Sequence, residues 1–238
     1  MSRLGGRLRT LADALRRTPL HPQWLIGPRE APAGLADVRG VVLDVGAADR
    51  WIEARLNPSA TYIAVDYPGT AVARYGTRPD AFADAARLPL PTASVDAVVC
   101  LETLEHVGDF ERSLAEIARV LKPGGRAFLS MPFLYPIHDA PFDHTRLTEH
   151  GWARHLALAG LAPLSIVPRG TALDVAGVAA CLALAAPIAG RSLPVALVMA
   201  SIATPLILGV NLAVAIGRRL WPNWRGQCLG YAIEARRP

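Results

Sequence analysis

The chain has 238 residues, enough for one α/β domain with an additional element, and 52% of them are hydrophobic. Its three cysteines are too few, and wrongly spaced, for a disulfide framework or a cysteine metal site, and they favour a reducing cytosol. The formal net charge of +5 favours an anionic partner, a class that includes nucleic acid, anionic lipid and acidic substrates.

Residues 1–34 are expected to form a basic amphipathic helix followed by a linker. Four leucines recur at helical spacing among arginines: Leu4, Leu8, Leu11 and Leu15. Proline and glycine then punctuate Pro19–Gly34. The helix either packs on its own domain or contacts anionic lipid, and the pattern does not decide between the two. Arginines interrupt the N-terminus and no apolar core follows, so no signal peptide is expected.

Residues 35–168 alternate strand-like with helix-like runs. Strands are expected at Val41–Val45, Thr61–Val65, Ala81–Ala83, Val95–Leu101, Arg126–Met131 and Leu164–Val167. Helices are expected at Trp51–Leu56, Asp109–Leu121 and Thr148–Ala159. Short turns between such elements predict an α/β fold with a doubly wound, Rossmann-like sheet. Ligands of such sheets lie at the carboxyl ends of the strands, so the turns after the strands are the place to look for a site.

Residues 169–225 are strongly apolar. No charge occurs in Val175–Gly190 or in Leu193–Gly217. A membrane span needs about 20 apolar residues, so the second segment qualifies and the first is marginal. The tail Cys228–Ala235 has a strand pattern, and if it joins the sheet beside Leu164–Val167, both ends of the apolar segment lie on one side. The sequence therefore predicts an inserted helical hairpin, with residues 226–238 returning to the domain formed by 35–168.

The arginines around this hairpin predict its orientation. Four of them flank its two ends: Arg169, Arg218, Arg219 and Arg225. Arg191 alone lies at the tip, as the positive-inside bias expects of a cytoplasmic base. We therefore expect the protein at the cytoplasmic face of the inner or plasma membrane. A buried helical cap, a dimer interface and a re-entrant hairpin in one leaflet are the alternatives.

A candidate nucleoside site follows the first expected strand. Asp44 ends that strand, and Gly46 allows a tight turn that a ligand can approach closely. Asp66 lies 22 positions after Asp44, at the end of the next strand. A carboxylate at that offset can accept hydrogen bonds from both hydroxyls of a ribose. By itself this pattern is generic.

Further motifs follow in a fixed order. They are Asp84–Pro91, Ser94–Val99, Leu104–Val107 and Leu121–Gly125. The ordered set resembles the class I S-adenosylmethionine-dependent methyltransferases, especially the branch with quinone-biosynthesis and small-molecule enzymes. The resemblance covers about Val41–Met131 and implies a methyltransferase sheet with S-adenosylmethionine as cofactor.

The resemblance also implies which residues bind the cofactor. They are Asp44, Gly46, Ala48, Asp66, Tyr67, Asp84, Ala85, Leu101 and Glu102. Asp44 and Gly46 would shape the turn around the methionine moiety, and Asp66 would hold the ribose. Asp84 would accept from the adenine amino group, while Leu101 and Glu102 would line the methyl-donor side.

The turn departs from the family pattern D-x-G-x-G-x-G. Ala48 and Arg50 stand at its second and third glycine positions. If the backbone is left-handed at position 48, alanine costs about 1 kcal/mol there. Arg50 would cap the site, contact the cofactor carboxylate or indicate weak binding. A degenerate, non-catalytic domain is the corresponding alternative.

The segment Met131–Arg146 is the candidate acceptor loop, because it follows the fifth strand. The candidate catalytic residues are His138, His144 and Asp143, and the candidate substrate contacts are Tyr135, Asp139 and Arg146. Histidine titrates near neutrality and suits a general base. In the alternative interpretation Asp143, Arg146 and Thr148 only fix the loop, and His106 only begins a helix. We predict no metal, since the spacing of His138, Asp139, Asp143 and His144 is not diagnostic.

These patterns together predict a methyltransferase that acts on a small-molecule or lipid-linked acceptor at the membrane. A quinone precursor, a lipid-linked glycan and a phospholipid headgroup all fit, and the acceptor loop is similar to one in methyltransferases of bacterial surface-glycan gene sets. A nicotinamide-dependent oxidoreductase would need G-x-G-x-x-G, which Gly46–Trp51 does not supply. A membrane-tethered scaffold with a degenerate pocket is the second alternative. No nucleic-acid partner is expected, because the basic residues form no stripe with aromatics.

Overall fold

The computed structural model describes residues 15–69, 76–221 and 224–238. The expected helix at Leu4–Leu15 lies almost entirely outside the described residues. The chain divides into two compact units. We call Glu30–Phe133, Ile137–Arg169 and Gly230–Pro238 the sheet unit. We call Met1–Arg29, Leu134–Pro136 and Gly170–Leu229 the hairpin unit.

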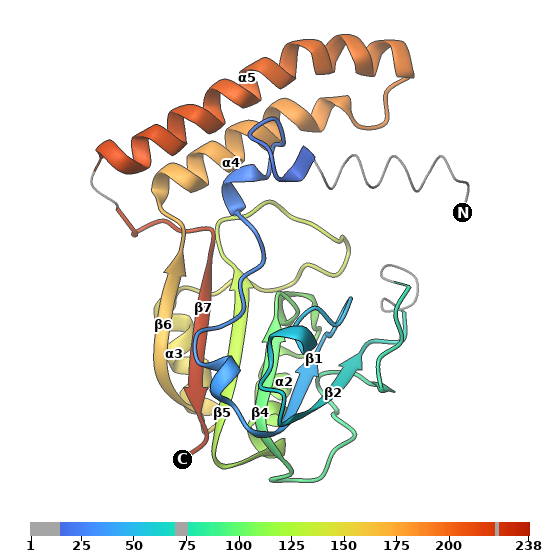
Figure 1. Ribbon diagram of the computed structural model, residues 1–238, viewed down its shortest axis with the longest axis vertical. Coiled ribbons are helices and arrows are strands. Elements are labelled where there is room, and N and C mark those ends of the chain that lie inside the picture. Colours follow the sequence, from blue (N-terminus) through green and yellow to red (C-terminus); the bar gives the residue numbers. More distant parts are fainter. Residues whose placement is uncertain (1–14, 70–75, 222–223) are drawn as a thin grey trace. The chain divides into compact units, whose positions relative to one another are not determined.

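The sheet unit is built on seven strands in the order β3-β2-β1-β4-β5-β7-β6 (Figure 1). Their bounds are β1 Gly40–Val45, β2 Ala60–Asp66, β3 Ala81–Phe82, β4 Val95–Leu101, β5 Leu121–Pro132, β6 Ala162–Arg169 and β7 Gly230–Arg236. Strands β1 to β5 are parallel, and β7 runs antiparallel between β5 and β6. The predicted Rossmann-like α/β sheet is confirmed, and the tail strand lies beside β6 as expected.

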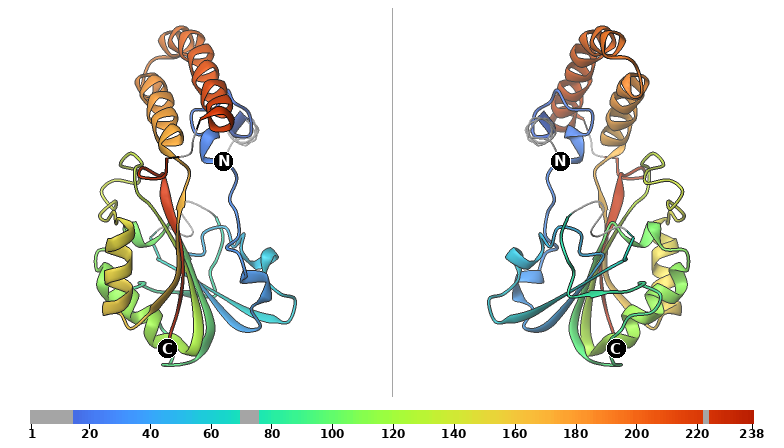
Figure 2. Two further views of the ribbon diagram at one scale, coloured as in Figure 1. Left: turned by 90° about the vertical axis from the view of Figure 1, so that its left-hand side faces the viewer. Right: turned by 90° about the vertical axis from the view of Figure 1, so that its right-hand side faces the viewer.

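Helices α2 (Phe110–Val120) and α3 (Glu149–Leu158) cover one face of the sheet (Figure 2). Asp109 caps α2 by accepting the Arg112 N–H, and Thr148 caps α3 in the same way. The central strands are apolar along their length because both of their faces are covered.

The other face carries the 3-10 turns η2 (Leu35–Asp37) and η3 (Glu53–Arg55) over a buried cluster that includes Leu35, Val42 and Phe128. The helix expected at Trp51–Leu56 is wrong in length, since only η3 forms. The backbone is left-handed at Arg50, before η3, and extended at Leu56, after it. Only one helical turn therefore fits between these two residues.

The hairpin unit contains α4 (Ala172–Ala185), the 3-10 turn η6 (Ala186–Ile188) and α5 (Leu193–Leu220). The predicted hydrophobic helical hairpin is therefore present. Cys181 on α4 packs against Ala203 and Ile207 on α5. The turn η1 (Trp24–Ile26) contributes Leu25, which packs with Val178 and Val214. These contacts bury one stripe of α5 at helical spacing.

Two buried polar side chains of the hairpin helices, Asn211 and Asp174, have hydrogen-bond or ion-pair partners. Asn211 is fully buried, and its side-chain amide donates to the carbonyl oxygens of Pro19 at 2.7 Å and His21 at 3.1 Å. Asp174 accepts from the Thr171 N–H at 2.7 Å and forms an ion pair with Arg218. These pairs remove the cost of placing polar groups in an apolar helix.

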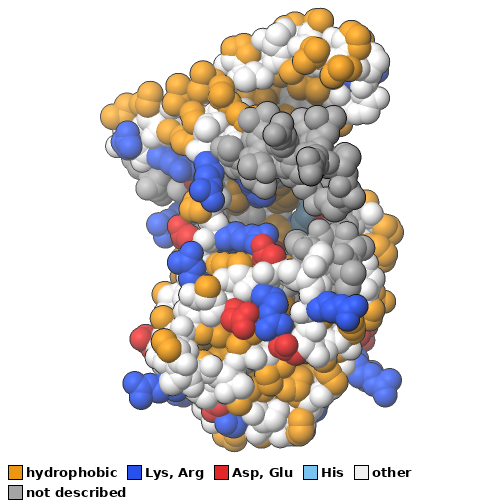
Figure 3. Space-filling view, turned by 45° about the vertical axis from the view of Figure 1, so that its right-hand side comes forward, with side chains coloured by type: hydrophobic (Ala, Val, Ile, Leu, Met, Phe, Trp, Pro, Cys, Tyr) orange, Lys and Arg blue, Asp and Glu red, His pale blue; other side chains and the backbone are white. Residues whose placement is uncertain are grey.

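Most of α5 is nevertheless exposed. By length and composition it could cross a membrane, with a mean hydropathy of 2.2 over a window of which only 11% is buried. Its exposed apolar side chains include Leu193, Val195, Leu197, Val198, Ile202, Leu206, Leu212, Ile216 and Leu220. Figure 3 shows hydrophobic side chains gathered over the hairpin helices. A core helix of the described chain would be buried, so α5 is not one.

Candidate active site

The turn after β1 adopts a left-handed backbone at all three positions where the family pattern has glycine. The φ angles are 75° at Gly46, 47° at Ala48 and 59° at Arg50. A non-glycine residue in this conformation costs roughly 1–2 kcal/mol. Gly46 is required for a second reason, because a Cβ there would overlap the side chain of Thr103. The β1 turn thus packs directly against the segment that follows β4.

Arg50 is held by groups of the sheet unit itself. Its guanidinium pairs with Glu53 and Asp80, each at 3.1 Å, and lies 5.0 Å from the centre of the Tyr62 ring. These contacts connect the β1 turn to β2, to the start of η3 and to the residue before β3. The expectation that Arg50 caps the site, contacts the cofactor carboxylate or indicates weak binding stays a prediction.

Asp66 joins the ends of β1 and β2. One carboxylate oxygen accepts the Ala48 N–H at 2.8 Å, and the other accepts the Tyr67 N–H at 2.7 Å. A carboxylate oxygen can accept more than one hydrogen bond, so these backbone bonds are compatible with Asp66 accepting from ribose hydroxyls as well. The Tyr67 ring is 57% exposed beside it. The residues present fit the ribose-binding role that the sequence predicts.

Asp44 is almost fully buried below the same turn. The Tyr62 hydroxyl donates to it at 2.6 Å. Burial raises the pKa of the Asp44 carboxyl to about 7, although the Tyr62 hydrogen bond opposes the rise. A cationic ligand group near this turn would favour the ionised form of Asp44.

The expected adenine side and the expected methyl side differ in how their exposed carboxylates are engaged. Asp84 is exposed after β3, and its carboxylate accepts the Ala86 N–H at 2.9 Å while Ala85 is buried. Glu102 follows β4, where Leu101 ends the strand and packs partly against the core. The Glu102 carboxylate accepts from two groups of the sheet unit, Ser130 Oγ at 2.7 Å and Arg169 Nη1 at 3.0 Å. The structure thus engages Glu102 with its own groups and leaves acceptor capacity at Asp84.

A second constellation lies past the ends of β4 and β5, and we call it the Glu105 cluster. It consists of Glu105, His106 and His138. The 3-10 turn η5 (Leu104–His106) places Glu105 fully inside, and neither carboxylate oxygen has a hydrogen-bond partner among residues 15–69, 76–221 and 224–238. The Nε2 atoms of His106 and His138 lie 3.7 and 3.9 Å from Glu105 Oε1. Burial raises the pKa of Glu105 to about 8, and burial lowers the pKa of His106.

The acceptor loop contacts η5 through one backbone–backbone hydrogen bond and one contact between a side chain and the backbone. The His144 N–H donates to the Glu105 carbonyl oxygen at 2.8 Å, and His106 Nδ1 lies 2.9 Å from the Phe142 carbonyl oxygen. The rings of His106 and His138 meet edge to face with centroids 5.0 Å apart. These bonds bring two segments that are distant in the sequence around one buried carboxylate.

Asp143 and Arg146 form the scaffold of this loop. Arg146 donates to both Asp143 oxygens, one at 2.7 Å, and the His138 N–H donates to Asp143 at 3.0 Å. Burial alone would raise the pKa of Asp143, but these hydrogen bonds lower it. The arrangement supports the structural alternative for Asp143 and Arg146. Asp139 lies nearer the cluster, with Oδ2 3.9 Å from His106 Nε2.

Comparison with known proteins fits this geometry. A family model described as a methyltransferase domain matches residues 43–129. Residues 43–129 form a methyltransferase domain. Together with its relatives, the domain implies S-adenosylmethionine as the cofactor.

The relatives of the methyltransferase domain cover only part of the chain. A protein of Mycobacterium tuberculosis described as a probable S-adenosylmethionine-dependent methyltransferase is 44% identical over 93 residues, or 35% of this chain and 34% of the relative. A ubiquinone/menaquinone biosynthesis C-methyltransferase of Caulobacter vibrioides is 41% identical over 93 residues, or 37% and 36%. The match thus spans about a third of the length of these curated relatives.

A solved structure extends the likeness of the fold beyond the methyltransferase domain. It is an S-adenosylmethionine-dependent methyltransferase from Mesorhizobium loti, with a TM-score of 0.54 at 18% identity. The match covers 86% of this chain and 94% of that one. At this identity the likeness shows the fold alone.

Two sequence-predicted residues, Tyr135 and His144, lie apart from the Glu105 cluster, and one residue of that cluster was not predicted. Tyr135 belongs to the hairpin unit, where it packs with the Leu25 cluster and its hydroxyl accepts from the Gln23 side chain. The His144 side chain is exposed and is not part of the Glu105 cluster. Glu105 was missed among the site residues. The available signal was an acidic residue next to histidine just past a buried strand.

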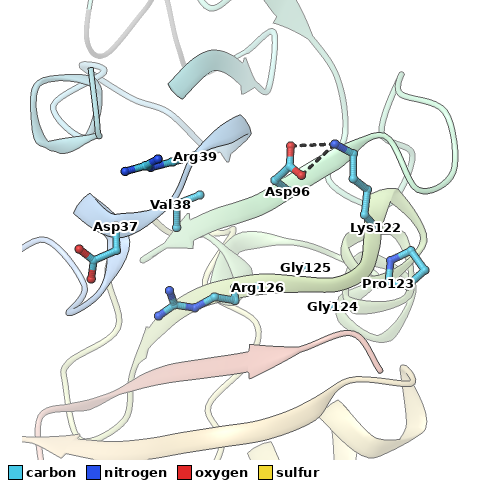
Figure 4. A pocket seen from close by; sticks show the side chains of 9 residues that line it. All are labelled: Asp37, Val38, Arg39, Asp96, Lys122, Pro123, Gly124, Gly125 and Arg126. Carbon is cyan, nitrogen blue, oxygen red and sulfur yellow. Dashed lines mark hydrogen bonds and ion pairs between the residues drawn. The ribbon is translucent and has the colours of Figure 1, made fainter. Parts of the chain in front are cut away.

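A pocket of about 370 Å³ lies at the opposite edge of the methyltransferase domain (Figure 4). It is lined by Asp37–Arg39, Asp96 and Lys122–Arg126, near the amino ends of β1, β4 and β5. Lys122 is paired with Asp96 at 2.8 Å, and Arg126 is paired with Glu234 at 2.8 Å. Since cofactors of such sheets bind at the carboxyl ends, this pocket is not the cofactor site.

Proposed function

We propose that this chain transfers the methyl group of S-adenosylmethionine to a small-molecule acceptor, and that the acceptor is lipid-linked. The observation that carries the proposal is the order of carboxylates Asp44, Asp66 and Asp84 at the ends of successive strands, with Asp66 fixing the β1 turn. A carboxylate is the acceptor that ribose hydroxyls and an exocyclic amine require. The match to a methyltransferase domain covers these three positions.

Methyl transfer of this kind is an in-line displacement. The acceptor atom forms a bond to the methyl carbon, the sulfonium sulfur leaves as a thioether, and an oxygen or nitrogen acceptor gives up its proton. The protein contributes alignment and proton removal. We assign proton removal to the Glu105 cluster, because it follows β4 and β5 and the β1 turn packs against the same segment at Thr103. Asp143 then serves to position His138.

The second part of the proposal is that the hairpin unit binds the cytoplasmic face of a membrane. A stripe of exposed apolar side chains runs along α5, opposite its buried stripe. Trp221 is 71% exposed just after the helix and Trp224 is 63% exposed, next to Arg218, Arg219 and Arg225. Tryptophan with arginine is typical of segments at a membrane–water interface.

A membrane-bound transferase meets acceptors that are themselves lipids. A quinone precursor fits because the Caulobacter relative is named for quinone biosynthesis. A lipid-linked glycan fits because the acceptor loop is similar to those of surface-glycan methyltransferases. Both share an apolar tail and a polar methyl-accepting head.

The proposed binding of the cofactor is tested by calorimetric titration of the purified protein with S-adenosylmethionine and S-adenosylhomocysteine. Asp66→Ala is expected to weaken binding by at least about tenfold, because it removes acceptors for two hydroxyls. Asp37→Ala is the matched control, since Asp37 lines the pocket at the opposite edge. If the wild-type chain binds neither compound, a scaffold with a degenerate pocket explains the left-handed Ala48 and Arg50 better, and the proposal fails.

The proposed membrane binding is tested by flotation with vesicles that contain anionic lipid. The double change Val198→Asp and Ile202→Asp places two charges on the exposed stripe and is expected to abolish flotation. Leu158→Asp is the control, because Leu158 is 69% exposed on α3 of the sheet unit. Recovery of the wild-type chain in the soluble fraction without detergent, as a monomer or as a dimer, contradicts the proposed membrane binding.

A further inference from the structure

The Glu105 carboxylate has no hydrogen-bond partner in the part of the chain that the structure describes. It is fully buried, and this holds for both of its oxygens. Buried carboxylates in proteins are paired, hydrogen-bonded or bound to a metal, because an isolated one is costly. The side chains that face it are the imidazoles of His106 and His138. These are the side chains that bind metal ions together with a carboxylate.

We infer that Glu105, His106 and His138 form a binding site for a divalent transition-metal ion. Two imidazole nitrogens and one carboxylate oxygen are a common ligand set for zinc and other first-row metals. The three ligand atoms all lie within 4.8 Å of one another. Metal–ligand bonds of about 2.0–2.1 Å place tetrahedral ligands roughly 3.3 Å apart. The distances of 3.7 and 3.9 Å from Glu105 Oε1 therefore need only a small contraction.

The surroundings set the histidine tautomers that such a site requires. His106 Nδ1 lies 2.9 Å from the Phe142 carbonyl oxygen, which can only accept, so Nδ1 carries the proton. The Nε2 lone pair of His106 then faces Glu105. Metal-bound histidines usually donate their other nitrogen to a carbonyl or a carboxylate in this way.

His138 has a corresponding partner in Asp143. His138 Nδ1 lies 3.3 Å from Asp143 Oδ2. Arg146 Nη2 lies 3.4 Å from the same nitrogen, and one of its two N–H groups donates to Asp143 Oδ2. Binding of an ion at Nε2 requires the tautomer with the proton on Nδ1, which the nearby Asp143 carboxylate favours. Asp143 is therefore a positioning residue for the ion site.

The exposure of the two histidines and the number of protein ligands indicate an ion that has one open coordination position. The side chains of His106 and His138 are 25% and 31% exposed, so an ion can enter between the two rings. Three protein ligands leave a fourth position for water or for a substrate oxygen, as in catalytic zinc sites. An acceptor hydroxyl bound there would lose its proton to solvent more readily. That role rests on the proposed methyl transfer, whereas binding of the ion does not.

The test is a titration of the chelator-stripped, full-length protein with Co²⁺, followed by visible absorption, and with Zn²⁺ in competition. One Co²⁺ per chain is expected. Glu105→Gln and His106→Gln should each weaken Co²⁺ binding by more than about 100-fold, beyond the roughly 10–100-fold loss typical of a changed second shell. Asp143→Asn should show that smaller loss. His150→Gln, a change at an exposed histidine on α3, should leave the affinity unchanged.

Two further measurements keep the outcomes distinct. Circular dichroism checks that each variant is folded, and S-adenosylmethionine binding is titrated on the same samples. Absence of stoichiometric Co²⁺ binding, or binding that survives both Glu105→Gln and His106→Gln, overturns the ion site. Displacement of Co²⁺ by an equal concentration of Mg²⁺ also overturns it, since imidazole ligands disfavour magnesium. Failure to bind S-adenosylmethionine, with Co²⁺ binding intact, overturns only the proposed function.

Discussion

The cofactor side and the acceptor side of the sheet edge hold their carboxylates in different ways. Asp66 and Asp84 accept hydrogen bonds from backbone N–H groups of the adjoining turns. Among the described residues Glu105 accepts none, and it faces two imidazoles instead. The first arrangement uses backbone groups of turns at the ends of adjacent strands, whereas the second needs side chains from two loops.

This difference indicates which kind of ligand each side can bind. A carboxylate that accepts backbone N–H groups can also accept hydrogen bonds from hydroxyl or amine donors. A buried carboxylate without hydrogen bonds favours a proton or a cation beside it. One sheet edge thus combines a site suited to a nucleoside with a site suited to a positive ion. We expect changes on one side to leave the other side intact, because the two sets of carboxylates lie on different segments of the chain.

The largest expected effect is on the stability of the acceptor loop. Asp143→Ala leaves Arg146 without its buried partner, and breaking such a pair costs about 3–5 kcal/mol. Urea unfolding should show this loss, with binding of S-adenosylmethionine unchanged in the folded protein. Asp139→Ala is the control, because the Asp139 side chain is 40% exposed. An equal loss in both variants would mean that the ion pair with Arg146 is not the cause.

The next effect is a pH dependence from Asp44. Its pKa is about 7 in the folded chain, above its ordinary value near 3.8, so the folded state binds the proton more tightly. The free energy of unfolding should therefore fall as pH rises from about 4 to 7, by at most about 4 kcal/mol. Asp44→Asn should flatten this slope in urea titrations at several pH values. A slope unchanged by the substitution would assign it to other groups.

A smaller effect is expected for the adenine contact. Asp84→Asn keeps an acceptor but removes its charge, so S-adenosylmethionine binding should weaken by roughly tenfold, as loss of one charged hydrogen bond predicts. Co²⁺ binding should not change, because Asp84 lies outside the Glu105 cluster. Both affinities are measured by titration. Loss of both would show that the two sides are coupled.

The smallest effect concerns the strained turn. Ala48→Gly relieves a left-handed alanine, a gain that greater freedom of glycine in the unfolded chain partly offsets. We expect a net stabilisation of about 0.5 kcal/mol by thermal unfolding, without weaker cofactor binding. Ala93→Gly, at another left-handed alanine far from the β1 turn in sequence, is the comparison. Destabilisation at position 48 alone would show that its methyl group packs usefully.

The sheet and the cofactor side could be predicted from the sequence because their signals are local. The apolar run Val95–Leu101 coincides with β4, since a parallel strand covered on both faces is apolar throughout. Asp66 could be placed by its distance from Asp44 along the chain. The 3-10 turn η3 could not be sized, because the left-handed backbone of Arg50 is set by the turn and not by helical propensity.

The acceptor side could be predicted only in part. His138 was identified from its loop, but glutamate is ordinarily exposed, so nothing in the sequence indicated that Glu105 is buried. Its neighbours are brought together by the long-range bonds from His144 and to Phe142. The crossing of Leu134–Pro136 into the hairpin unit, which takes Tyr135 with it, is likewise a tertiary feature.

The unequal arms of the hairpin limit how deep it can enter a bilayer. At a rise of 1.5 Å per residue, α5 with 28 residues is about 42 Å long and α4 with 14 is about 21 Å. A hydrocarbon core about 30 Å thick can be crossed by α5 but not by α4, which would leave Arg191 at the tip inside the lipid. We therefore expect a monotopic anchor that lies along the surface of one leaflet, with the exposed stripe of α5 toward the lipid and Arg191 in contact with water. Such an anchor would receive its acceptor by lateral diffusion within that leaflet, so the acceptor's tail would never need to leave the lipid.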